Sequence, residues 1–144
     1  MKGLILMIAA FILPLNVLLA QSNDAQGRGQ GSRDSRLYDP KSVVKIEGTI
    51  TDIQNYSPEG TGRNGIHIKL KTNKKTMNVH LGPSWYIDKQ DVKLNINDKI
   101  TVTGSVVTYS GSKVIIASKV EKGKKILELR DTNGIPLWSG KGRQ

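Results

Sequence analysis

The sequence of 144 residues contains no cysteine, and only 5% of its residues are aromatic. Disulfide bonds, thiolate metal ligands and a lipid-modified cysteine are therefore excluded, so stability must come from a packed core. The single phenylalanine, Phe11, lies in the apolar N-terminal segment. Few rings remain elsewhere to stack on bases, as proteins that hold single-stranded nucleic acid require.

Motifs of common catalytic sites are also missing. The sequence contains no GxSxG, no HExxH and no phosphate-binding GxxxxGK[ST]. The glycine-rich stretch GRGQGSR (residues 27–33) is not preceded by a strand pattern, which such a loop needs. We therefore expect a protein that is not an enzyme.

The N-terminus has the pattern of a secretory signal peptide. Lys2 is followed by an apolar run and by Leu18-Leu19-Ala20, which predicts a signal over residues 1–20. The alternative is an uncleaved membrane anchor, but the run is interrupted by a proline and an asparagine and is shorter than the ~20 residues that a spanning helix needs. We expect a periplasmic or secreted protein with no transmembrane segment after cleavage.

The remaining chain divides by composition. Residues 21–41 are rich in Gly, Ser, Gln and Arg and predict a disordered linker, residues 42–139 predict one small domain, and residues 140–144 form a basic tail. The net charge is +10, of which Lys2 alone belongs to the signal. This balance favours an anionic partner, such as nucleic acid, an acidic lipid surface or an acidic polysaccharide, or else reflects only the solubility of a basic exported protein.

The domain reads as strands with one short helix. Alternation of apolar and polar residues predicts five strands, at residues 43–54, 66–72, 76–81, 99–109 and 113–120, and a helix over residues 83–91. Gly48 predicts a bulge or bend within the first strand. The order predicts an all-β, five-stranded OB-fold Greek-key barrel with one helix between strands 3 and 4. A C-terminal hairpin extension is expected at residues 124–138.

Two motifs carry a resemblance to known proteins: HLGPSWY (residues 80–86) and LRDxxGxPLW (residues 129–138). The run from Gly48 to Trp138 resembles a group of small exported bacterial proteins described as OB-fold or nucleic-acid-binding-like. Its core is similar to some magnetosome-associated proteins. The resemblance implies the fold and supplies no catalytic residue, and a fold does not imply a function.

The two histidines of the chain are candidate metal ligands. A two-residue turn at residues 73–74 places His67 beside His80 on the polar face of the hairpin, whereas a turn at residues 74–75 shifts this pairing. Two imidazoles could ligate a divalent zinc, copper or iron ion, with Asp, Glu, Met or water completing the site. The alternative is two ordinary polar residues on the outside of a sheet, with no cofactor.

The hairpin is also basic. Candidate ligand-binding residues are its lysines, both histidines and two tyrosines near loops: Lys69, Lys71, Lys74, Lys75, His67, His80, Tyr56 and Tyr109. The leading hypothesis is a non-catalytic OB-fold module that recognises an anionic ligand or partner, with nucleic acid the default candidate. The alternative is an envelope accessory or interaction protein that binds a metal through His67 and His80.

Further residues are expected to be structural. We expect Trp85 and Tyr86 to plug the open end of the barrel rather than line a ligand pocket, and Trp138 to pack on the barrel. An ion pair between Arg130 and Asp131 is expected to hold the final turn. Gly82 and Pro83 are expected at the exit of the third strand, where proline suits the start of a helix.

Overall fold

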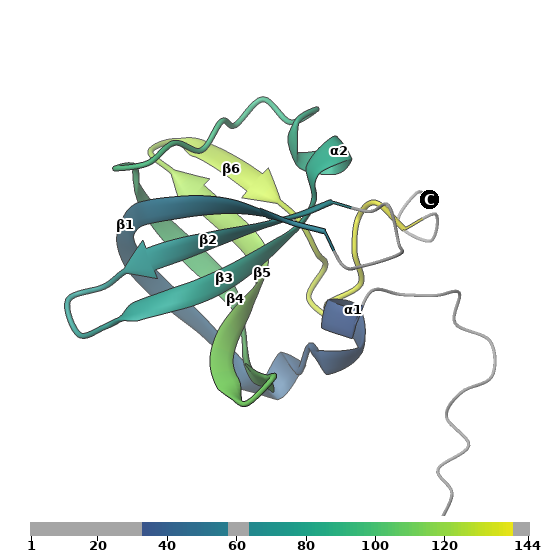
Figure 1. Cartoon of the computed structure of the whole chain (residues 1–144). Coiled ribbons are helices and arrows are strands. Elements are labelled where there is room, and N and C mark those ends of the chain that lie inside the picture. The colour runs from purple at the N-terminus through teal and green to yellow at the C-terminus, as the bar shows by residue number, and fades with distance from the viewer. Residues whose placement is uncertain (1–32, 58–63, 140–144) are drawn as a thin grey trace, which may run out of the picture.

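The computed structural model describes residues 33–57 and 64–139, which form a strongly curved sheet with short helices at its ends (Figure 1). The expected signal peptide, residues 21–32 of the expected linker and the basic tail lie outside the described residues. Within the described part, no helix is long and apolar enough to span a membrane.

The elements follow the predicted order closely. They are α1 (Arg33–Leu37), the 3-10 helix η1 (Pro40–Ser42), β1 (Val43–Tyr56), β2 (Gly65–Lys71), β3 (Thr76–Pro83), α2 (Ser84–Ile87), β4 (Lys99–Tyr109), β5 (Ser112–Lys122) and β6 (Lys125–Glu128). The prediction of an all-β, mostly antiparallel protein with few helices is confirmed. The number of strands differs, because β6 joins the sheet as a sixth strand instead of standing apart in an extension.

The strands are ordered β3-β2-β1-β4-β5-β6, and β3 also pairs in parallel with β5. The long strand β1 serves two neighbours: residues 43–49 pair with β4 and residues 49–56 pair with β2. The β2–β3 register places His67 opposite His80, as the turn at residues 73–74 predicts. Apolar residues of alternating positions therefore share the inner face of the sheet.

Aliphatic side chains fill the space inside the sheet. The largest completely buried ones are Ile50, Ile68, Leu70, Leu81, Ile100, Ile115, Ile116, Leu127, Leu129, Val79, Val102 and Val120. They come from all six strands and from the segment after β6. A core without cysteine or phenylalanine is thus built almost entirely from branched aliphatics, which suit a pleated surface.

Gly48 permits a close approach of two strands. A Cβ at this position would lie 2.7 Å from the Lys71 carbonyl oxygen and 2.8 Å from Leu70 Cγ. The irregularity of β1 itself falls between Ile50 and Asp52, at Thr51, three residues after Gly48. The glycine therefore allows β1 to cross the end of β2 tightly, and the bulge behind it completes the change of partner.

The helix after β3 is shorter than predicted and buries different residues. It ends at Ile87 instead of residue 91, and Trp85 is 54% exposed, so the expectation that Trp85 plugs the barrel is wrong. A single helical turn can present only one side to the core, and Tyr86 and Ile87 occupy that side. Val92, in the following segment, supplies additional buried surface.

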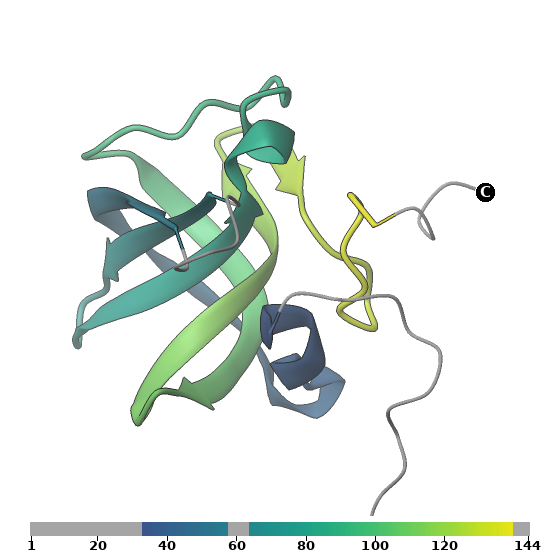
Figure 2. The ribbon, with the colours of Figure 1, turned by 45° about the vertical axis from the view of Figure 1, so that its right-hand side comes forward.

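The linker prediction is wrong for residues 33–41, which fold against the domain. Tyr38 is buried against Gly134, a residue with φ of 80° whose missing Cβ leaves room for the ring. The Asp39 amide donates to the Ser105 hydroxyl at 3.0 Å. Figure 2 shows α1 beside the strands and next to the loop that follows β6. The polar composition of this segment predicted that it could not offset the conformational entropy lost on ordering. Its contacts with distant segments of the chain supply that stabilisation.

We expect Gly104→Ala to destabilise the protein by about 3 kcal/mol, because the added methyl group would meet the Ile116 carbonyl oxygen and lie 2.8 Å from Ala117 Cα. Neither backbone atom can move without disturbing the β4–β5 pairing. Gly65→Ala is the control, since its Cβ would meet nothing closer than 3.7 Å. Urea unfolding measures both variants, and equal losses would contradict this account of Gly104.

Candidate functional site

Four aromatic rings lie in a row on the outer face of the sheet. His67 and His80 stack with ring centroids 3.7 Å apart and planes 3° from parallel. Tyr56 stacks on the other side of His67 at 5.1 Å, and Tyr109 meets His80 edge-on at 5.0 Å. The β2–β3 register and the ends of β1 and β4 thus bring together four of the predicted site residues.

The helix α1 covers one end of this row. Asp34 Oδ1 lies 3.1 Å from His80 Nδ1, and the Arg33 guanidinium lies 4.5 Å from the Tyr109 ring centroid. His80 is consequently only 4% exposed, although the sequence places it on the polar face of the hairpin. The polar face of the hairpin is buried at this point because α1, which precedes the strands in the sequence, packs over it.

The protonation states follow from the surroundings. Burial acts to raise the pKa of Asp34, but the hydrogen bond with His80 and the charges of His80, Arg130 and His67 together hold it below its ordinary value. An ionised carboxylate only accepts, so the His80 Nδ1 carries the hydrogen of the Asp34–His80 contact. Burial, and secondly the charge of His80, lowers the pKa of His67 to about 4, so His67 is neutral at neutral pH.

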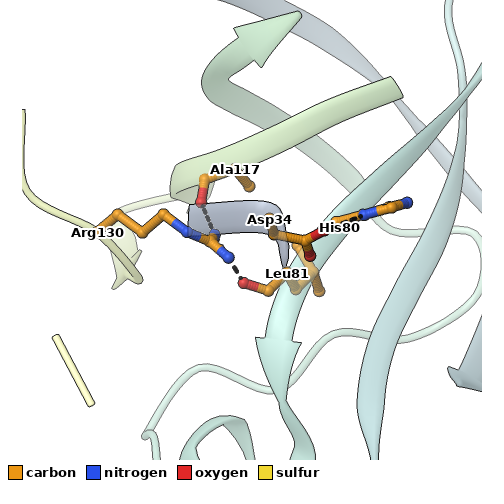
Figure 3. A network of polar contacts seen from close by, with 5 residues as sticks. All are labelled: Asp34, His80, Leu81, Ala117 and Arg130. Carbon is orange, nitrogen blue, oxygen red and sulfur yellow. Dashed lines mark hydrogen bonds and ion pairs between the residues drawn. The ribbon is translucent and has the colours of Figure 1, made fainter. Parts of the chain in front are cut away.

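A buried arginine lies behind Asp34. The Arg130 Nη1 donates to the Leu81 carbonyl at 3.0 Å and to the Ala117 carbonyl, which ties β3 to β5 (Figure 3). Burial lowers the pKa of Arg130 to about 10, and the negative charge of Asp34 acts in the opposite direction. Arg130 is therefore charged at neutral pH. The Asp34 carboxylate hydrogen-bonds His80 and also stabilises the charge of Arg130 electrostatically.

The expected ion pair between Arg130 and Asp131 is not what holds the final turn. The Asp131 carboxylate instead accepts from the backbone amides of Asn133 and Ile135, each at 2.9 Å. Arg130 points inward and lies 5.0 Å from the Trp138 ring centroid. Trp138 packs on the core and covers Gly82, where a Cβ would be 2.6 Å from the indole. A short polar side chain at a turn commonly accepts hydrogen bonds from nearby backbone amides, and Asp131 does so here in place of the expected ion pair.

Asp34, His67 and His80 could hold a metal ion between them. One donor atom from each lies within 4.8 Å of the other two. Two ligands that each lie about 2.1 Å from one ion are separated by about 3.0 Å at an octahedral angle and by about 3.4 Å at a tetrahedral angle. The 3.1 Å between Asp34 Oδ1 and His80 Nδ1 lies within this range, so an ion could take the place of the hydrogen between them. Because the His67 and His80 rings are stacked in parallel, the His67 ring would have to turn about its side-chain bonds before its in-plane lone pair could reach the same ion.

The predicted residues fall into two separate groups. Tyr56, His67, His80 and Tyr109 form the aromatic row, whereas Lys71, Lys74 and Lys75 line a groove at the tip of the hairpin, and Lys69 lies along β2. Asp34 was not predicted, because it lies in a polar stretch without a strand pattern. The nearby Leu37-Tyr38, the first apolar pair within the predicted linker, is the signal that this stretch docks on the domain.

The fold and the Asp–His–His cluster define an all-β protein with a candidate metal centre. Residues 42–127, more than half of the chain, match the MamS/MamX magnetosome protein family, and the chain belongs to that family. The predicted similarity to magnetosome-associated proteins is thereby confirmed. The search of curated proteins gives no match.

Among solved structures, the dimeric N-terminal domain of PriB from Thermoanaerobacter tencongensis aligns with a TM-score of 0.42 and 11% identity. The alignment covers 59% of this chain and 99% of that one. Similarity of this size does not establish the OB fold.

We expect the metal-free protein to lose stability as the pH falls from about 6.5 to about 4. The unfolded chain protonates His67 near its ordinary pKa of 6.5, whereas the folded chain does so only near 4, so the unfolded state binds more protons across this window. His67→Asn removes this difference. Urea unfolding between pH 7 and pH 4 should therefore show a free energy of unfolding that depends less on pH for the variant than for the unaltered protein. An unchanged dependence would contradict the lowered pKa of His67.

We expect Arg130→Ala to lower the free energy of unfolding by about 3 kcal/mol, because it removes two buried hydrogen bonds and the support beneath Trp138. Arg36→Ala is the matched control, since Arg36 is exposed on α1. Thermal and urea unfolding measure both. A loss for Arg130→Ala no larger than that of the control would show that the guanidinium does not hold β3 and β5 together.

Proposed function

We propose that this protein is a non-catalytic accessory protein of the cell envelope that binds a divalent transition-metal ion with Asp34, His67 and His80. The observation that carries the proposal is the convergence of their three donor atoms within 4.8 Å. The charge state supports it, because Asp34 is ionised and His67 is neutral, as metal ligands must be. Two imidazoles and one carboxylate suit divalent first-row metals such as zinc, cobalt and iron.

The accessory role is supported by the family and by the sequence. Membership of a magnetosome protein family is consistent with a protein that works beside an organelle assembly. The predicted signal peptide directs the chain to the periplasm or the exterior. No motif of a common catalytic site occurs in the sequence, which favours binding over catalysis.

We also infer that the architecture is of the OB type. Support comes from the order of three strands, one helix and two strands, and from the parallel pairing of β3 with β5 at residues 78–80 and 114–116. On such a fold, exposed aromatic faces beside basic residues hold single strands of nucleic acid. Here the faces of His67 and His80 are stacked on each other and covered by α1. The two faces that stack on each other are not available to bases, and the convergence of three donor atoms supports metal binding instead.

The proposal predicts one tight site per chain for Co²⁺ or Zn²⁺. Full-length protein, freed of its purification tag and of metal, should bind Co²⁺ with visible absorption bands that Zn²⁺ abolishes. His67→Ala, His80→Ala and Asp34→Ala should each weaken binding by about tenfold or more, because each removes one ligand. Affinity should also fall as the pH is lowered, since protons compete for the imidazoles.

Asp52→Asn provides the matched control, because Asp52 is a carboxylate on β1 outside the cluster. It should bind Co²⁺ as the unaltered protein does. The proposal fails if the protein takes up no Co²⁺ or Zn²⁺, or if the three cluster variants bind as tightly as Asp52→Asn.

A further inference from the structure

An open groove of about 1040 Å³ separates the N-terminal half of β1 from the turn between β2 and β3. The groove forms because β1 exchanges partners at Thr49, so that the hairpin tip diverges from residues 43–48. None of the residues of the candidate metal site lines it. The groove is therefore a second, independent feature of the surface.

One wall of the groove is a free strand edge. Within the described residues, positions 43–48 pair only with β4. The Ile50 amide donates to the Asp98 carbonyl and the Ile50 carbonyl accepts from Asn97, so even-numbered positions direct their backbone groups toward β4. By alternation, the backbone N–H and C=O groups of Lys45 and Glu47 point into the groove. An extended peptide could pair with them.

The opposite wall is positively charged, and hydrogen bonds hold the backbone of the turn that carries its lysines. Lys71, Lys74 and Lys75 form no ion pair within the part of the chain that the structure describes. The Thr72 hydroxyl accepts from the amides of Lys74 and Lys75 at 3.2 and 3.1 Å, which holds the turn that carries them. Three uncompensated ammonium groups thus face a strand edge.

The lining also decides which anion fits. Every cation that lines the groove is a lysine, and the lining contains no arginine and no aromatic ring. Single-stranded nucleic acid gains part of its affinity from stacking on aromatic rings, and no nucleic acid has an amide backbone that could pair with a strand. The apolar side chains of Ile46 and Met77 also line the groove and favour a partner with alternating apolar and acidic residues.

We propose that this groove binds an extended acidic segment of a partner protein, which adds as a strand to residues 43–48 of β1. Its backbone pairs with Lys45 and Glu47, and its carboxylates meet Lys71, Lys74 and Lys75. Exposed strand edges recruit peptides in this way, with the main chain supplying affinity and the side chains selecting the partner. The proposal is independent of the metal site.

The test uses the full-length protein and a fluorescent peptide of alternating Glu and Val, followed by fluorescence anisotropy. The triple variant Lys71→Glu, Lys74→Glu, Lys75→Glu should bind the peptide about tenfold more weakly or worse, because repulsion replaces attraction. The control is Lys89→Glu, Lys93→Glu, Lys124→Glu, which makes the same charge change outside the groove and should bind within about twofold of the unaltered protein. The single variant Lys74→Glu serves if the triple variant does not fold.

A second peptide separates strand addition from simple charge attraction. The same sequence with every backbone amide N-methylated keeps every carboxylate but donates no backbone hydrogen bond from either edge, so it should bind about tenfold more weakly. Equal binding of the methylated peptide would overturn the proposal, as would equal losses for both triple variants. Competition by inorganic polyphosphate or single-stranded DNA as strong as that of the peptide would show a nonspecific anion surface and would also overturn it.

Discussion

The buried guanidinium of Arg130 is the contact on which the arrangement of the site depends. It donates to carbonyl groups of β3 and β5, at Leu81 and Ala117, where these two strands run in parallel over only a few residues. The bonds are charge-assisted and shielded from water, conditions in which a hydrogen bond contributes most. Trp138 covers the arginine from the C-terminal side, so the segment after β6 is attached through the same group.

A buried positive charge requires a negative one nearby, since the interior solvates it poorly. Asp34 meets this need from a helix of only five residues, which could not form alone in water. The same carboxylate accepts a hydrogen bond from His80 and so fixes the orientation of one of the two central rings of the aromatic row. The electrostatic requirement of Arg130 thereby helps to place a carboxylate beside the two histidines.

Much of the sheet was predictable because branched aliphatics alternate cleanly along it. The pairing of His67 with His80 was one of the two predicted registers, the one with a turn at residues 73–74, and the boundaries of β4 were predicted correctly. The docking of α1 was not predictable in the same way, since Asp34 belongs to a polar stretch whose order depends on distant groups. The inward direction of Arg130 was not predicted for a related reason. Arg130 bonds backbone carbonyl groups, which every residue has, so the sequence does not distinguish its partners.

The close contact of Tyr38 with Gly134 joins two segments that lie almost at opposite ends of the described chain. Closing a loop of this length costs conformational entropy, which the packed contact has to offset. The family match ends at residue 127 and begins at residue 42, so Asp34, Tyr38, Arg130 and Gly134 all lie outside it. The strands alone therefore supply the histidine pair, whereas a fragment limited to the matched residues would lack both Asp34 and the Tyr38–Gly134 contact that attaches its segment.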